Sequence, residues 1–368
     1  MKADKKEPLF RIFKRGIIPW WTSLGIRLIG LLLALIVCAL IIFGITKLNP
    51  LKVYATMWAG AFSTNRRMWV TIRDTMMMLC IGLGLAPAFK MKFWNIGAEG
   101  QVLAGGIAAA ACMLYLPKTL PNWLALVIMC AASALAGAVW AFFPGFFKAK
   151  INTNETLFTL MMNYIAIRIT AFFVAKWENP YGSNTVGIIN SSSKFGWFPK
   201  VFGQQYGLNV ILVVILTIFI FVYLKYTKHG FEIAVVGDSE NTARYCAINV
   251  EKVIIRTMML SGAICGIAGF LVVAGASHTI STETAGGRGF TTIIVTWMSK
   301  FNSFIMAIVS AFLVFLERGA SEIASQYNLS DYISNVVKGI ILIFLLGSEF
   351  FVNFKVRIRG SHKSEVTK

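Results

Sequence analysis

The stretch that decides the fold spans positions 95 to 101 and reads Asn95-Ile96-Gly97-Ala98-Glu99-Gly100-Gln101. It places a carboxylate, two side-chain amides and two glycines inside an otherwise apolar part of the chain. In hydrocarbon every polar group must find a partner within the protein, and a buried carboxylate is costly. We therefore expect this stretch to line a cavity or an interhelical contact, which indicates transport rather than packing alone.

The composition predicts an all-α polytopic membrane protein. Of 368 residues, 57% are hydrophobic and only 14% are charged, whereas soluble domains carry about 25% charged residues. The net charge of +19 comes from basic residues that lie mostly in short loops between apolar segments. This is the charge pattern of a membrane protein, so we expect no nucleic-acid partner.

The sequence carries no pattern typical of a catalytic or metal site. Its six cysteines show no CxxC spacing, and its three histidines form no HExxH motif, so we expect no metal ligands. No GxxxxGK[ST] loop or GxSxG elbow is present. The chain is expected to be a non-enzymatic transport subunit without a cofactor of its own.

Apolar segments predict the membrane topology. They occur at about 24–45, 68–89, 96–116, 122–143, 156–175, 208–224, 253–275, 290–316 and 334–352. An odd number of spans would put the two basic chain ends on opposite sides, against the positive-inside rule. We therefore expect segment 290–316 to be a half-helix ending near Met298 and a second span from about Phe304, which gives about ten elements.

This topology defines the expected domains and orientation. A basic N-terminus (1–23) precedes one transmembrane domain (24–352) and a basic tail (353–368), with both ends in the cytoplasm. The pieces assigned to the cytoplasm carry roughly twice as many Lys and Arg residues as the outer pieces. The longest outer segment, 176–207, reads as an ordered or semi-ordered loop.

Residues 228–252 predict a short helix lying across the membrane face. Asp238 or Ser239 suits a helix cap, and Glu240 and Asn241 suit a first turn. A solvated loop is the alternative. In the following span Gly262 and Gly266 form a small-residue face, for which we expect close helix packing.

Other polar residues within apolar segments have structural as well as functional interpretations. Asn154 and Glu155 open the span at 156–175, and Asn163 lies within it. Glu155 has a simple alternative role, because a carboxylate in the first turn of a helix complements the helix dipole. Arg73 and Arg168 have long side chains that can reach a membrane interface, so neither is strong support for a site.

The run Phe93 to Gln101 resembles the signature of ABC importer permeases of the branched-chain amino acid, ribose and nucleoside family, above all its nucleoside branch. Further stretches support the resemblance over about 70–350: Asn154 to Ala166, Gly237 to Ile248 followed by Ser261 to Gly269, and Gly287 to Ile293. Two positions depart from the family pattern. Asn302-Ser303 stands where relatives often have Asn-Pro, and Ala247 stands where they have glycine.

The resemblance implies a type II-like importer permease with pseudo-symmetric halves in a bacterial plasma membrane. Its partners would be a second permease subunit, identical or homologous, and cytoplasmic ATPase subunits that bind ATP and magnesium. An extracytoplasmic binding protein or lipoprotein would deliver the solute, and membrane lipid would surround the spans. The Gly-rich breaks at 97–106 and 286–289 lie in the two halves, as interrupted helices do in pseudo-symmetric transporters.

The resemblance also implies residue roles. The residues expected to line or gate the substrate path are Asn95, Glu99, Gln101, Asn154, Glu155 and Asn163. Their amides suit the hydroxyl groups of a neutral nucleoside. The residues expected to couple the permease to the ATPase are Gly237, Asp238, Asn241, Ala243, Arg244, Tyr245 and Ile248.

Three alternatives remain open at this point. The solute could be a ribose- or galactose-like sugar or a branched-chain amino acid. The chain could instead be a secondary transporter driven by protons through Glu99. An intramembrane enzyme or assembly scaffold is a third reading, although no clustered catalytic set supports it.

Overall fold

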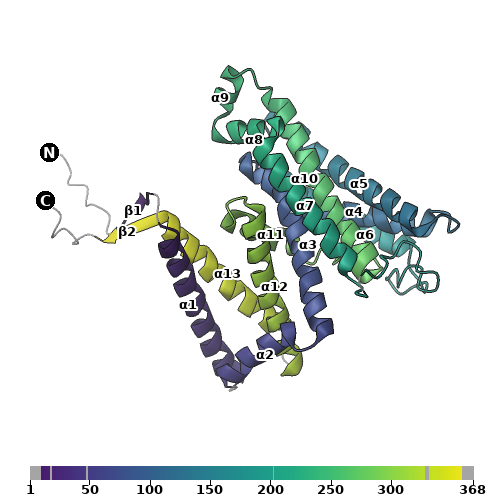
Figure 1. Cartoon of the computed structure of the whole chain (residues 1–368), viewed down its shortest axis with the longest axis horizontal. Helices are drawn as coiled ribbons and strands as arrows, with labels where there is room; N and C mark the ends of the chain where they lie inside the picture. The colour runs from purple at the N-terminus through teal and green to yellow at the C-terminus, as the bar shows by residue number, and fades with distance from the viewer. Residues whose placement is uncertain (1–9, 17–18, 47–48, 202, 328–330, 359–368) are drawn as a thin grey trace, which may run out of the picture. The chain divides into compact units, whose positions relative to one another are not determined.

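The computed structural model describes residues 10–16, 19–46, 49–201, 203–327 and 331–358, most of them helical (Figure 1). In chain order the elements are β1 (Phe10–Lys14), α1 (Trp20–Thr46), α2 (Pro50–Phe62), α3 (Asn65–Lys90), α4 (Ala98–Tyr115), α5 (Asn122–Ile151), α6 (Glu155–Lys176), α7 (Gly207–Tyr226), α8 (Lys228–Asp238), α9 (Glu240–Tyr245), α10 (Val250–Val272), the π-helix η1 (Val273–Ser277), α11 (Arg288–Met298), α12 (Ser303–Gln326), α13 (Asp331–Asn353) and β2 (Phe354–Ile358).

The prediction of an all-α polytopic membrane protein is confirmed. Among the described residues, 8 helices are long and apolar enough to cross a membrane, and a shorter apolar helix covers Gly339–Asn353. The half-helix α11 completes the expected set of about ten elements. Helix α2 and the two short strands were not expected. Helix α2, with 13 residues, is shorter than a membrane span, and each strand has only 5 residues.

The predicted break within 290–316 is confirmed in position. Helix α11 ends at Met298 and α12 begins at Ser303. Between them Lys300 and Phe301 adopt left-handed backbone angles, with φ of 48° and 63°. The Asn302 side-chain oxygen then accepts the N–H groups of Phe304 (3.0 Å) and Ile305 (3.3 Å), which starts α12.

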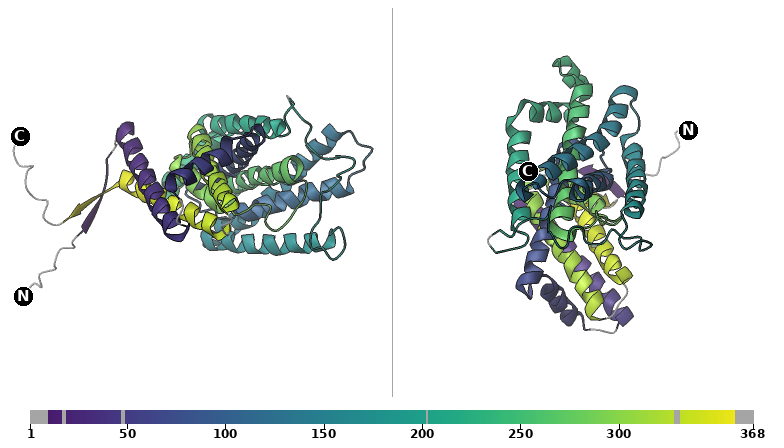
Figure 2. Two further views of the ribbon diagram at one scale, coloured as in Figure 1. Left: turned by 90° about the horizontal axis from the view of Figure 1, so that it is seen from below. Right: turned by 90° about the vertical axis from the view of Figure 1, so that its right-hand side faces the viewer.

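Contacts divide the chain into two compact units, residues 1–63 with 315–368 and residues 64–314. In the first unit α1 packs along α13, and the Arg27 guanidinium lies 2.8 Å from the Glu349 carboxylate. Strands β1 and β2 continue from these two helices and pair antiparallel (Figures 1 and 2). The division does not test the single transmembrane domain expected over 24–352, which stays a prediction.

Helix α10 is the centre of the second unit, where it packs against α3, α4 and α5. The expected close packing of its glycine face is confirmed. A Cβ added to Gly262 would lie 2.2 Å from the Gly137 carbonyl oxygen, and one added to Gly266 would lie 2.1 Å from that of Ser133. The backbones of α10 and α5 therefore approach so closely that no side chain fits between them at these positions.

The prediction of a single surface helix within 228–252 is wrong in one respect, because the structure has two helices there. Helix α8 ends at Asp238, and Ser239 adopts an extended conformation before α9 begins at Glu240. The Ser239 hydroxyl accepts the Thr242 N–H at 3.3 Å, so Ser239 is the helix cap. Gly237 and Asp238 thus belong to the end of α8 and not to the helix that carries Arg244. Figure 1 shows α8 and α9 together at one end of the second unit.

Candidate functional site

A non-helical segment connects α3 to α4, with Gly97 as the last residue before α4. Its backbone groups are bonded by side chains of α6. The Ile96 N–H donates to the Thr159 hydroxyl (3.2 Å), and the Ile96 carbonyl accepts from the Asn163 amide (2.9 Å). The Asn163 side-chain oxygen also accepts the Gly100 N–H at 2.9 Å. Asn163 therefore replaces the helical hydrogen bonds that this segment lacks.

The amides of Asn95 and Gln101 form a second buried cluster. The Asn95 oxygen accepts the Gly97 N–H (3.0 Å) and the Gln101 amide (3.2 Å). The Asn95 amide nitrogen donates to the Ser261 hydroxyl of α10 at 3.0 Å. Both amide side chains are fully buried. In this conformation they bond within the protein and fix the segment against α10.

Glu99 joins the N-termini of two helices. It lies in the first turn of α4, and its carboxylate accepts the backbone N–H groups of Gly287 (2.7 Å) and Gly289 (2.9 Å) at the start of α11. Helix N-termini favour a negative charge and offer unpaired N–H groups. A Cβ added to Gly289 would lie 2.6 Å from the Glu99 nitrogen, so only glycine permits this approach. The two Gly-rich breaks of the sequence thus meet at one carboxylate.

A buried charged cluster lies beside this junction. Asp74 of α3 is 1% exposed and pairs with Arg73 (2.8 Å) and with Arg288, the first residue of α11 (3.3 Å). Arg73 also lies over the Tyr206 ring, with its guanidinium carbon 5.0 Å from the ring centroid. From the sequence, Arg73 was expected to be able to reach a membrane interface, and Arg288 was not expected to take part in a site. An Asp within an apolar segment was the signal that a buried pair was needed.

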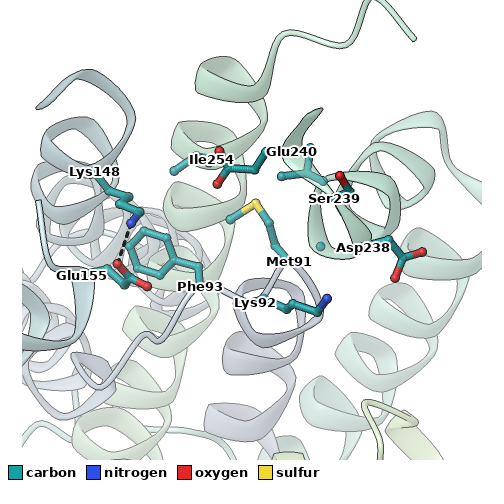
Figure 3. Close-up of a pocket in the computed structure, with 11 residues that line it drawn as sticks. Met91, Lys92, Phe93, Lys148, Glu155, Asp238, Ser239, Glu240 and Ile254 are labelled. Atoms are coloured by element: carbon teal, nitrogen blue, oxygen red, sulfur yellow. Dashed lines mark ion pairs between the residues drawn. The ribbon is translucent and has the colours of Figure 1, made fainter. Parts of the chain in front are cut away.

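Asn154 and Glu155 lie apart from the buried amides, at the start of α6. Asn154 is exposed and caps the helix, since its side-chain oxygen accepts the Leu157 N–H at 3.1 Å. Glu155 pairs with Lys148 at the end of α5 (2.9 Å). Both charges line a groove of about 250 Å³ shared with the segment after α3 and the α8–α9 junction (Figure 3).

The predicted coupling residues divide by exposure. Asp238, Asn241, Arg244 and Tyr245 are exposed, and Tyr245 is 92% exposed. Ala243 is fully buried, Gly237 is buried, and Ile248 is partly buried. The segment therefore presents polar and aromatic side chains outward while smaller residues hold it to the bundle.

Gly237 connects the α8–α9 segment to the end of α3. A Cβ added to it would lie 2.3 Å from the Lys90 carbonyl oxygen and 3.2 Å from the Met91 Cα. Lys90 ends α3, and the non-helical segment with Asn95 follows directly. The outward-facing helix α9 is thus linked through one close backbone contact to the segment that leads to Glu99.

His229 fastens the start of α8. Its Nδ1 lies 2.6 Å from the Tyr223 hydroxyl of α7, and its Nε2 lies 3.4 Å from the Thr257 hydroxyl of α10. Burial lowers the pKa of His229 below its usual value. The neutral imidazole is therefore the form that this position stabilises.

Comparisons of the sequence with known proteins match this chain to transport proteins. The family model described as branched-chain amino acid transport system / permease component matches residues 68–346. The guanosine ABC transporter permease protein NupP of Bacillus subtilis is 29% identical over 347 residues, which cover 93% of this chain and 99% of the relative.

Two further relatives are named for different solutes. The nucleoside ABC transporter permease protein NupB of Lactococcus lactis is 26% identical, over 87% of this chain and 90% of the relative. The glucose ABC transporter permease protein TsgB13 of Haloferax volcanii is 24% identical, over 94% of this chain and 92% of the relative.

Proposed function

The chain belongs to the permease component family of branched-chain amino acid transport systems, and on that premise we propose that it is the permease subunit of an ABC importer for nucleosides. Two relatives named for guanosine and nucleoside transport support this solute class. Both match most of the present chain. The segment before α4 has polar side chains in and around it that can form hydrogen bonds with hydroxyl and amide groups. A path for nucleosides requires such side chains.

The proposal includes the partners that supply energy and solute. Separate ATPase subunits bind ATP and magnesium, and a second permease subunit, identical or homologous, completes the pathway. An extracytoplasmic binding protein or lipoprotein delivers the nucleoside. Both termini and the α8–α9 segment face the cytoplasm of a bacterial cell, which the excess of Lys and Arg in those pieces supports.

The mechanism rests on a continuous series of contacts. The exposed face of α9, with Arg244 and Tyr245, docks on the ATPase. Movement of this segment reaches the end of α3 through the close contact between Gly237 and Lys90. The hydrogen bonds of Asn95 and Asn163 make the next segment stiff, so it transmits displacement to Glu99 and from there to α11. Rigid-body shifts of packed elements are a common form of such transmission.

The substrate-path roles follow from the same segment. When α11 moves relative to α4, the amides of Asn95, Gln101 and Asn163 exchange bonds within the protein for bonds to a passing nucleoside. Glu99 gates this step because it holds the two helix N-termini together. Glu155 lines the groove at the cytoplasmic end, where the solute leaves, and Asn154 caps the helix that carries it.

The observation that carries the proposal is that α9 has an exposed face and that Gly237, just before α9, contacts the end of α3, from which the segment with Asn95 continues. The test is uptake and ATP hydrolysis by the reconstituted importer with Arg244→Ala or Tyr245→Ala. We expect both variants to lose ATP-driven uptake and to release the ATPase on purification. Tyr181→Ala is the matched control, since Tyr181 is 96% exposed on a loop far from α9 in sequence. Unchanged uptake in both α9 variants would refute the docking role.

A sugar is the second candidate solute, because the glucose permease relative matches as much of the chain as the nucleoside permeases do. The partner binding protein decides between the two. Thermal stabilisation of that protein by nucleosides and not by hexoses or pentoses supports the first candidate, and the reverse supports the second.

A further inference from the structure

A pocket of about 240 Å³ lies in the second unit where three spans end. Helix α3 ends at Lys90, α7 ends at Tyr226 and α12 begins at Ser303. The lining combines three lysines, Lys90, Lys225 and Lys300, with apolar side chains such as Phe221 and Phe301. Because membrane-spanning helices end near the boundary between hydrocarbon and headgroups, we expect the pocket to lie at that depth.

The three lysines bring positive charge to this pocket without a balancing carboxylate. No Asp or Glu is among the lining residues. Lys90 Nζ donates to the Leu224 carbonyl oxygen at 3.1 Å, and Lys225 Nζ lies over the rings of Phe221 (5.4 Å) and Tyr226 (5.2 Å). Within the described part of the chain these lysines form no salt bridge. An anion would satisfy them better than water alone.

Ser303 supplies a second, independent observation. It is 1% exposed and lines the pocket, yet its hydroxyl has no hydrogen-bond partner among the described residues. Buried hydroxyls are normally bonded, and an orphan one indicates a missing partner. Ser303 is also the first residue of the 24-residue helix α12, whose N-terminus favours negative charge.

We propose that this pocket binds a phosphate group. A phosphate offers several strong acceptor oxygens, so it can accept from Ser303 and from the lysines at once. A single carboxylate would leave most of the positive charge unbalanced. The volume also accommodates a phosphate with some of its hydration water, since a water molecule occupies about 30 Å³ in the liquid.

The phosphate can come from an anionic phospholipid or from a free phosphate compound. The position at the ends of α3, α7 and α12 and the apolar wall of Phe221 and Phe301 suit a lipid headgroup, because basic pockets between spans bind such headgroups. The experiment separates the two sources.

The test uses the purified full chain in neutral detergent, with retention of phosphatidylglycerol against phosphatidylcholine measured by native mass spectrometry. Inorganic phosphate is titrated in parallel and followed by the thermal unfolding midpoint. Lys225→Gln with Lys300→Gln removes two exposed charges without touching the core. We expect it to weaken phosphate-group binding at least about tenfold, since each basic residue near a headgroup contributes roughly fivefold. Lys252→Gln, an exposed lysine outside the pocket, should change nothing.

Ser303→Ala adds a second readout, because it removes the orphan hydroxyl and keeps every charge. We expect weaker binding with no loss of thermal stability in the absence of ligand. Loss of phosphatidylglycerol retention in these variants identifies a lipid site, and loss of the inorganic phosphate shift alone identifies a site for free phosphate. Equal binding of both probes by the wild type and the double lysine variant overturns the proposal. So does a double variant that loses only its association with the ATPase.

Discussion

The Glu99 carboxylate lies 2.7 Å from the Gly287 backbone nitrogen, although 188 positions separate these residues in the chain. This bond, with the second one to Gly289, makes one side chain the cap of α11 and a member of the first turn of α4. Both bonds run from backbone N–H groups of one helix start to a side chain of another helix. We therefore expect Glu99 to act as a tether between α4 and α11.

Glu99→Gln should therefore destabilise the protein. The neutral amide has one acceptor oxygen in place of two and lacks the charge that complements the α11 dipole, so we expect a loss of about 2 kcal/mol in the free energy of unfolding. Thermal unfolding in detergent measures it. Glu240→Gln is the control, because Glu240 is exposed and also lies in the first turn of a helix. A Glu99→Gln protein that keeps wild-type stability and loses only proton-dependent uptake would support the secondary-transporter alternative instead.

Two glycines, Gly266 in α10 and Gly347 in α13, predict opposite effects of an added methyl group. Gly266→Ala should destabilise the protein by about 2 kcal/mol or more, because its Cβ would meet the Ser133 carbonyl oxygen at 2.1 Å. Gly347→Ala in α13 should be neutral or stabilising by up to about 1 kcal/mol, since an added Cβ there meets no described atom within 4 Å and alanine favours helix. Denaturation midpoints of both variants provide the measurement, and equal midpoints would be inconsistent with backbone-to-backbone packing.

Ala247→Gly should stabilise the α9 region. Ala247 has a φ of 56°, in the left-handed region that costs a non-glycine residue about 1 kcal/mol. The sequence marked this position as a departure from the family's glycine, and the backbone supplies the physical reason for that glycine. Hydrogen exchange of the Thr242 and Ala243 amides should slow in the variant. Faster exchange would show that the turn does not strain alanine.

His229 predicts a loss of stability in mild acid. Its folded pKa is lowered by burial, whereas the unfolded side chain titrates near 6.5. The unfolded chain therefore binds the proton more readily than the folded chain. The contribution of His229 to the free energy of unfolding is greatest above about pH 6.5 and decreases as the pH drops toward the lowered folded pKa. His229→Gln should flatten this pH dependence. A slope identical to that of the wild type would exclude His229 as its source.

The sequence predicted the elements well because their apolar runs are long. Even the break before Ser303 was placed within a residue, since an over-long span with polar residues has few other solutions. The bonding partners could not be predicted. Nothing in the sequence indicated that Glu99 meets Gly287 or that Asp74 meets Arg288, because these pairs depend on how distant helices pack.

The surface segment shows the same limit. The residue types predicted a helix cap near Ser239. They did not predict the separate helix α8, because its eleven residues show only a weak helical periodicity of apolar residues. The contact of Gly237 with Lys90 depends on the backbone path alone. Sequence reasoning identified Gly237 through family resemblance without the physical reason for it.

The most direct test of the account is Gly237→Val in the complete importer, with ATP hydrolysis and nucleoside uptake measured on the same vesicles. The added side chain would separate α8 from the end of α3 and leave the exposed face of α9 unchanged. We predict that the ATPase still copurifies and hydrolyses ATP while uptake per ATP falls at least about tenfold. Unchanged uptake per ATP would contradict transmission through this contact.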